Sequence, residues 1–258
     1  MPPSDPAAAY PGDAPRVCVD LAPGHAAAAQ SLWRLLPPGC VLHVSHPAAL
    51  PNTDVPVSLT WPAASWPAPP VGGKVVSLVW PLAAHAPDEA AIAEWRQVLS
   101  RWQAAHAGLT GLLNPGQLPE PGDHRSLEAL IGASLQTGCP LTLDLHAALA
   151  RAHLAAHAFD HAASMEAAAA TVHQAVSQLP GRCVGRLEVG GQQRWHAATP
   201  LADQRVPEAL WRLVENLCTV WGPREVRVKW QGDAPAMAVL ADEARLARLS
   251  QGRRARGD

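Results

Sequence analysis

The side chains of this sequence that could do chemistry lie in or at the ends of short apolar runs. Asp144 and His146 belong to the run LTLDLH. Glu188 belongs to CVGRLEV, and Lys229 belongs to EVRVKWQ. Carboxylates and imidazoles of this kind bind divalent metals or transfer protons. On a single strand Asp144 and His146 would face the same side, as a shared metal site requires. A hydrogen-bonded structural pair is the alternative that their spacing leaves open.

Three histidines form a second candidate group. His153, His157 and His161 are four residues apart, which predicts that they share one face of a helix. Two histidines at this spacing can chelate a metal. The alternative is a polar helix face, in a chain that has 12 histidines. The sequence contains no GxGxxG, P-loop, HExxH or GxSxG motif and no zinc-type cysteine spacing, so the polar residues match no familiar catalytic set.

The elements that must position these residues are strands alternating with helices. Eight short runs rich in Val and Leu predict strands, at 16–22, 40–45, 55–61, 74–80, 109–114, 141–146, 183–189 and 225–231. Helical patterns occupy 26–36, 88–107, 126–136, 147–179 (two helices, broken near 159–164), 207–221 and 236–249. This order predicts a parallel α/β sheet, and eight strands in 258 residues favour a closed (β/α)₈ TIM barrel. The Pro-rich segment 62–73 and the short segment 47–54 predict irregular second and third crossovers.

Composition supports one soluble domain. Apolar residues make up 48% of the chain and charged residues 16%, which is enough for a single core over 16–249. Segments 1–15 and 250–258 are predicted to be a disordered tail and a basic tail. A formal charge of −2 lacks the positive excess that is typical of nucleic-acid-binding proteins. No apolar run is long enough to span a membrane. Five cysteines without a CxxC pair indicate a reducing compartment, and we expect a cytoplasmic protein.

Several segments resemble one enzyme family. LTLDLHAALARAHLAAHAFDH, CVGRLEVGG and DQRVPEALWRLVENLCTVWGPREVRVKW follow one another as the corresponding segments do in the multinuclear non-haem iron-dependent oxidases. RVCVDLAPGH and LLNPGQLP are similar to N-terminal segments of the same family. The resemblance covers about 16–249, and the chain is identified as a divergent member. It implies a xylose-isomerase-like barrel whose relatives oxidise cysteine-containing precursor peptides presented by a partner protein.

The resemblance also implies that most iron ligands have been replaced. At ligand positions of the family the chain has side chains that donate poorly or not at all, namely Thr60, Leu78, Val79, Leu113, Gln192, Leu201 and Ala202. Asp144 and Asp203 keep the family's residue type, and His25 matches a family histidine. His146 replaces an asparagine, Glu188 replaces a histidine and Lys229 replaces a glutamate. An ammonium repels a metal cation, so Lys229 is predicted to pair with Asp144 or Glu188 and to replace the charge of the metal.

Two functions remain open. The first is a binding or scaffolding protein without a cofactor, whose partner is a protein or a precursor peptide. The second is an active enzyme: an oxidase or isomerase with iron or another divalent metal on some of His25, Asp144, His146 and Glu188, or a metal-free isomerase or lyase. A sugar-phosphate isomerase is suggested by fold analogy alone. Trp61, Trp66 and Trp80 gather around the third and fourth strand ends of a chain with 10 tryptophans. They are candidates for partner binding, with core packing as the alternative.

Overall fold

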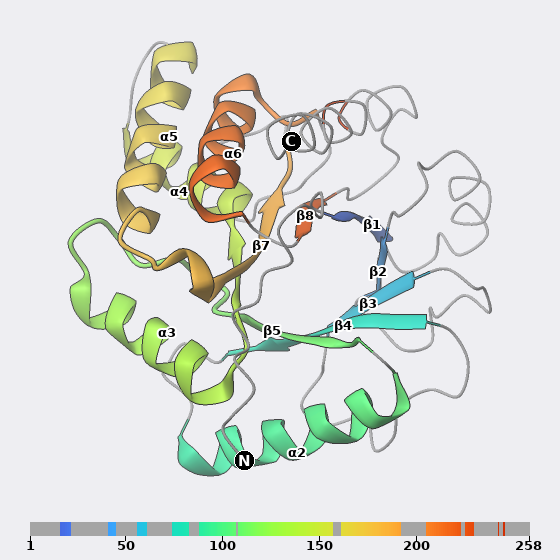
Figure 1. The fold of residues 1–258 in the computed structure, drawn as a ribbon. Helices are drawn as coiled ribbons and strands as arrows, with labels where there is room; N and C mark the ends of the chain where they lie inside the picture. Colours follow the sequence, from blue (N-terminus) through green and yellow to red (C-terminus); the bar gives the residue numbers. More distant parts are fainter. Residues whose placement is uncertain are drawn as a thin grey trace.

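A ring of parallel strands forms the centre of the molecule. The computed structural model describes residues 16–21, 41–44, 56–60, 74–82, 88–106, 108–156, 161–191, 205–222 and 225–229, together with Asp242 and Arg245. The strands are β1 Arg16–Leu21, β2 Val41–Val44, β3 Pro56–Thr60, β4 Lys74–Pro81, β5 Thr110–Asn114, β6 Leu141–Asp144, β7 Val184–Val189 and β8 Glu225–Val228. They pair in chain order, and β8 pairs with β1 to close the barrel (Figure 1).

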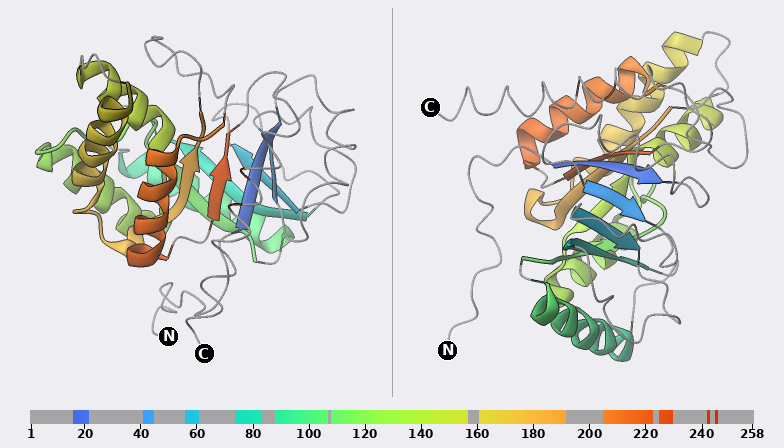
Figure 2. Two further views of the ribbon diagram at one scale, coloured as in Figure 1. Left: turned by 90° about the horizontal axis from the view of Figure 1, so that it is seen from above. Right: turned by 90° about the vertical axis from the view of Figure 1, so that its right-hand side faces the viewer.

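The strength of the pairing differs around the ring. Every neighbouring pair is parallel. The β5–β6 seam carries one registered pair, Leu113 with Leu141, and a backbone hydrogen bond of 2.9 Å from the Leu113 N–H to the Pro140 carbonyl. The β1–β4 strands lie side by side with their arrows in one direction (Figure 2). The predicted α/β architecture with a curled parallel sheet is therefore confirmed, and it is TIM-barrel-like.

Helices cover the outside of the ring on the β4–β8 side (Figures 1 and 2). They are α2 Glu89–Ala105, α3 His124–Thr137, α4 Leu145–Ala156, α5 His161–Val176, the 3₁₀ turn η2 Gly181–Cys183, and α6 Glu208–Trp221. Aspartates begin two of them. The Asp88 side chain accepts the Ala91 N–H at 2.8 Å, and the Asp123 side chain accepts the Ser126 N–H at 3.1 Å. Such caps satisfy N–H groups that have no partner within the helix.

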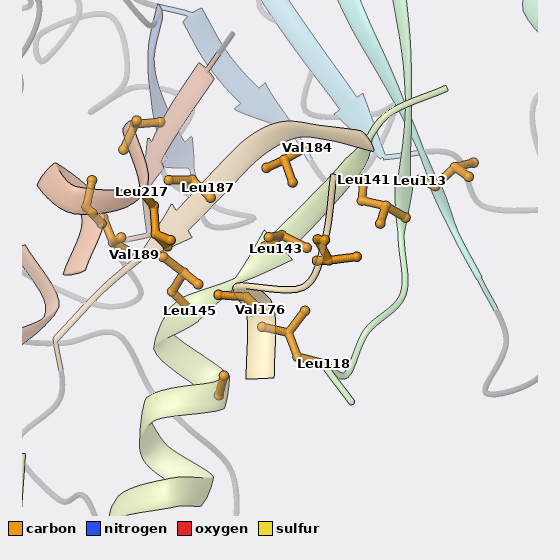
Figure 3. Close-up of a cluster of buried hydrophobic side chains, with 14 of the residues drawn as sticks. Leu113, Leu118, Leu141, Leu143, Leu145, Val176, Val184, Leu187, Val189 and Leu217 are labelled. Atoms are coloured by element: carbon orange, nitrogen blue, oxygen red, sulfur yellow. The ribbon is translucent and has the colours of Figure 1, made fainter. Parts of the chain in front are cut away.

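The apolar core lies between the ring and these helices. Alternate residues of each strand face outward, and the helices bury them. In Figure 3, Leu143 of β6 and Val189 of β7 belong to one cluster with Val176 of α5 and Leu217 of α6. On the β4 side, Trp80 stacks on Trp95 of α2 with ring centroids 5.2 Å apart. The outer face of the ring is thus apolar, and it leaves the inner face for polar residues.

Within the described residues, the predicted elements agree with the structure with one local exception. The strand expected over 141–146 ends at Asp144, and α4 begins at the next residue. The Asp144 Oδ1 atom accepts the Ala147 N–H at 2.9 Å, so Asp144 acts as a helix cap. The expected helix over 147–179 is two helices, as predicted. Segments 1–15, 26–36, 47–54, 62–73 and 250–258 lie outside the described residues, as does most of 236–249.

None of the helices in the described part of the chain combines the length and the apolar character needed to cross a membrane.

Candidate functional site at the barrel mouth

Charged side chains fill the inside of the ring along β6, β7 and β8. Arg186 of β7 donates hydrogen bonds to Ser58 of β3 and Ser77 of β4, which lie on the other side of the barrel. Its side chain therefore crosses the interior. Because side chains alternate along a strand, Glu188 shares the inner face of β7 with Arg186. The register pairs Arg186 with Glu225 and Glu188 with Arg227. The inner faces of β7 and β8 thus carry opposite charges at the same level.

Four of these side chains form a connected group at the carboxyl ends of the strands, which we call the mouth network: Asp144, Glu188, Arg227 and Lys229. The Lys229 Nζ atom lies 2.6 Å from Asp144 Oδ2 and 3.9 Å from Glu188 Oε2. The other oxygen of Glu188, Oε1, lies 2.7 Å from an Arg227 nitrogen. The sequence predicted that Lys229 would pair with Asp144 or Glu188, and the structure pairs it with Asp144.

The mouth network is partly open to solvent. The Lys229 side chain is 17% exposed and the Asp144 side chain 16%, whereas Glu188 is 2% exposed. The Lys229 N–H donates to the Val189 carbonyl at 2.7 Å, which fixes the backbone of Lys229 at the end of β8. A solute at the mouth would therefore meet Lys229 and Asp144 before the two deeper side chains.

Mutual attraction sets the protonation of the pair. Burial alone would raise the pKa of Asp144, but the Lys229 charge and the Ala147 N–H outweigh it, and the pKa is lowered. Burial would likewise lower the pKa of Lys229, but the charges of Asp144 and Glu188 outweigh it, and the pKa is raised. Both side chains are therefore charged at neutral pH. A protonated lysine in this position is a poor nucleophile and a poor base.

A second polar group lies deeper in the barrel, and we call it the floor network: Arg186, Glu225, Ser58 and Ser77. Arg186 Nε lies 2.7 Å from Glu225 Oε2, and its NH2 atom lies 2.7 Å from Ser58 Oγ and 2.8 Å from Ser77 Oγ. Arg186 has no exposed surface. Interiors of such barrels are usually filled by branched apolar side chains. Here an arginine joins β7 and β8 to β3 and β4.

His146 does not share a strand face with Asp144, so that expectation is wrong. It is the second residue of α4 and is 1% exposed. The physical reason is the N-cap: Asp144 bonds to the Ala147 N–H, and this starts the helix at Leu145. The positive form of His146 lowers the pKa of Asp144 only as a minor influence. Within the described residues, no group of three or more His, Cys, Asp or Glu side chains converges in a way that could hold a metal.

The remaining candidate residues from the sequence analysis are not part of the mouth network as the structure describes it. His25, Trp61, Trp66, His157 and Asp203 lie outside the described residues. His153 is buried on α4, whereas His161 begins α5. The prediction of one shared helix face is therefore wrong for these two histidines. Trp80 is half-buried and packs on α2 through its contact with Trp95, which is the packing role left open above.

The sequence interpretation missed Arg186, Glu225, Arg227 and the two serines. A signal was present, because RLE in β7 and EVRVK in β8 alternate charges of opposite sign with a period of two. Two neighbouring strands with this pattern can pair their charges when the register allows it. Ser58 and Ser77 gave no such signal, since their contact with Arg186 depends on the closure of the barrel.

The residues present do not fit the iron cluster implied by the family resemblance. Leu78 and Leu113 belong to the apolar cluster that also contains Trp95 of α2, and apolar side chains donate nothing to a metal. Asp144 and Glu188 are oxygen donors, but the Lys229 ammonium lies against them. A metal at this point would have to displace a bonded cation.

Comparisons with known proteins give no family. No family model matches the sequence, and no curated protein matches it. Among solved structures, the chain is similar to a "putative fructose-1,6-biphosphate aldolase" from Coccidioides immitis. The sequence identity is 14% and the TM-score 0.37, over 93% of this chain and 86% of that chain. A likeness at this level carries no argument about function. The class defined by strand pairing and helices is a TIM-barrel-like α/β protein.

Proposed function

We propose that this chain is a divergent, xylose-isomerase-like (β/α)₈ relative of the iron-dependent peptide oxidases that binds or scaffolds a partner without a metal cofactor. The observation that carries the proposal is the Lys229 ammonium, 2.6 Å from Asp144 and 3.9 Å from Glu188. It neutralises the carboxylates that a metal would need. The proposed partner is a protein or a cysteine-containing precursor peptide, and the proposed location is the cytoplasm.

Electrostatics favours the ammonium over a metal at this position. A divalent ion beside Lys229 would meet a positive charge at about 4 Å, which costs about 4 kcal/mol per unit charge at the effective dielectric of a protein surface. It would also have to separate Lys229 from Asp144. Arg227 adds a second positive charge next to Glu188. A site built for a metal normally leaves its carboxylates to the metal and to neutral hydrogen-bond donors.

The chemistry at the mouth supports binding better than oxidation. Lys229 and Asp144 expose a cation and an anion side by side, and both are held in place by their mutual hydrogen bond. Fixed charges of this kind position polar groups of a partner without moving electrons. The alternative is a metalloenzyme that uses iron or another divalent ion on Asp144, Glu188 and residues such as His25 and Asp203.

Metal analysis separates these two functions. Protein purified without chelators should contain far less than one equivalent of iron, manganese or zinc, and should show no charge-transfer absorption. A Lys229→Glu variant purified in parallel is the matched control, since it restores a carboxylate at that position. Near-stoichiometric iron with visible absorption in the unaltered protein would overturn the proposal and establish the metalloenzyme.

A further inference from the structure

We propose that Lys229 is the built-in cation of the barrel mouth: its ammonium occupies the position at which a free metal ion would otherwise bind Asp144 and Glu188. This inference deepens the proposed function and rests on its metal-free part, which metal analysis of the unaltered protein tests separately. It concerns which cation neutralises the two carboxylates, and it holds whether or not the barrel binds a partner.

The geometry places both carboxylates around one point. Asp144 and Glu188 are register partners on adjacent strands, so both project from the same level of the barrel. The Lys229 Nζ atom lies between their oxygens, at 2.6 Å and 3.9 Å. Divalent ions bind carboxylate oxygens at about 2.0–2.6 Å. An ammonium and a metal ion would therefore compete for almost the same place.

The charge balance depends on this ammonium. The mouth network contains two anions, Asp144 and Glu188, and two cations, Arg227 and Lys229, so its formal sum is zero. Without Lys229 the sum is −1, because two negative charges would remain against one positive charge. Arg227 is bonded to Glu188 Oε1 at 2.7 Å, and the Lys229 ammonium is bonded to Asp144 Oδ2 at 2.6 Å. The uncompensated charge would thus fall on Asp144, which is mostly buried.

The ammonium is tethered, and this gives it an advantage over a free ion. The Lys229 N–H is bonded to the Val189 carbonyl at 2.7 Å, directly after β8. The side chain therefore starts from a fixed point beside its two partners. A tethered group has a high effective concentration, and it does not have to be recruited from solution. The unaltered protein should consequently be indifferent to added divalent ions.

Removal of the ammonium should create a dependence on such ions. In Lys229→Met, which keeps the length of the side chain and removes its charge, we expect the melting temperature to fall by about 4–8 °C in metal-free buffer. Manganese or magnesium should recover part of this loss, by about 3 °C at ten times its dissociation constant. Two carboxylates completed by water predict weak binding, with a dissociation constant of about 1 mM.

The test compares thermal melts of four proteins at matched ionic strength: the unaltered chain, Lys229→Met, Lys229→Arg and the double variant Lys229→Met with Asp144→Asn. Sodium chloride replaces the metal salt in the controls. Only Lys229→Met should respond to manganese, and electron paramagnetic resonance should count one bound ion in it. Lys229→Arg keeps the charge and should stay insensitive, whereas Asp144→Asn removes one ligand and should abolish the response.

Several results would overturn the proposal. One is a Lys229→Met protein that melts at the same temperature with and without manganese. Another is a metal response that persists in the double variant, which would place the ion elsewhere. If Lys229→Met does not fold on purification, its refolding yield is measured with and without manganese. Equal failure under both conditions, while Lys229→Arg folds, would also contradict the proposal.

Discussion

The buried side chain of Arg186 connects four strands inside the barrel. It has no exposed surface, and it is hydrogen-bonded to Glu225, Ser58 and Ser77. A buried ion pair is a modest source of stability when compared with an apolar pair of the same size. Removal of one partner is costly, because it leaves the other charge buried and uncompensated. The importance of Arg186 therefore lies in its dependence on Glu225.

Arg186→Met should destabilise the protein by about 3–5 kcal/mol, since Glu225 would lose its buried partner. The double variant Arg186→Met with Glu225→Leu should recover a large part of this loss. Arg212→Met is the matched control, because Arg212 pairs with Glu166 on the surface and should change stability by less than about 1 kcal/mol. Urea unfolding followed by circular dichroism measures all three. Equal effects of Arg186→Met and Arg212→Met would contradict the buried role.

The pair of Asp144 and Lys229 should make stability depend on pH at both extremes. The folded pKa of Asp144 is lowered from 3.8, so its contribution is present above pH 3.8 and is lost as the pH falls through the folded value. The folded pKa of Lys229 is raised from 10.5, so its contribution is present below pH 10.5 and is lost as the pH rises through the folded value.

The comparison of the unaltered protein with Asp144→Asn isolates this effect. Asparagine keeps an acceptor for the Ala147 N–H but removes the charge that attracts Lys229. The difference in unfolding free energy between the two proteins should be largest from about pH 5 to pH 9 and should shrink in acid. Urea titrations across this range measure it. A difference that does not change with pH would show that the charge of Asp144 contributes nothing.

At the scale of the elements, β5 lies close to α2 at Gly111. A Cβ atom at Gly111 would lie 2.7 Å from both Cys139 Sγ and Leu99 Cδ2. Trp95 of α2 donates its indole N–H to the same Cys139 sulfur at 3.4 Å. β5, α2 and the segment just before β6 thus meet where a side chain fits only if Leu99 or Cys139 shifts. The absence of a side chain at Gly111 lets α2 lie against the barrel wall.

Gly111→Ala should therefore destabilise the protein by about 1–3 kcal/mol through overpacking. Gly132→Ala is the matched control, because a Cβ atom there would meet nothing within 4 Å. Gly132 lies inside α3, where alanine should stabilise the helix by about 0.5–1 kcal/mol. Thermal unfolding of both variants checks the opposite signs. If Gly111→Ala is as stable as the unaltered chain, the packing of α2 on β5 is looser than the distances indicate.

At the scale of the whole molecule, Asp242 and Arg245 attach to α6 and to the residues just before it. Asp242 is 1% exposed, and it accepts the Val206 N–H at 3.1 Å and the Trp211 indole N–H at 3.3 Å. Arg245 lies over the ring of Trp211, with its guanidinium carbon 5.5 Å from the ring centroid, and it pairs with Glu208 and Glu215. These contacts, distant in sequence, hold Asp242 and Arg245 against α6.

Asp242→Ala should cost about 1–3 kcal/mol, because it leaves two buried donors without an acceptor. Arg205→Met is the matched control: Arg205 lies 4.0 Å from Asp242 but is largely exposed, so its removal should cost less than about 1 kcal/mol. Chemical unfolding followed by tryptophan fluorescence measures both. A change of similar size in the two variants would show that the Asp242 hydrogen bonds contribute little.

The local sequence pattern was sufficient to predict most of the strands and helices that the structure describes. The β-branched runs predicted the eight strands, and the helical spacing predicted α2, α3 and α6 within a few residues. Asp144 shows where such a pattern fails. The pattern of LTLDLH predicts one strand, but an aspartate before an alanine-rich stretch is also typical of a helix cap. In the structure Asp144 caps α4, and the strand ends there. Side-chain periodicity and capping act within a few residues, so a linear sequence expresses them directly.

The pairing of the side chains inside the barrel could be seen only in the closed barrel. The sequence suggested a partner for Lys229 on Asp144 or Glu188, and the structure provides Asp144 at 2.6 Å. The sequence gave no indication that Arg186 would meet Ser58, a serine 128 residues away. Whether two charges pair depends on strand register and on barrel closure, and both are set by contacts between distant segments. The types of the inner side chains are therefore local information, whereas their partners are a property of the folded chain.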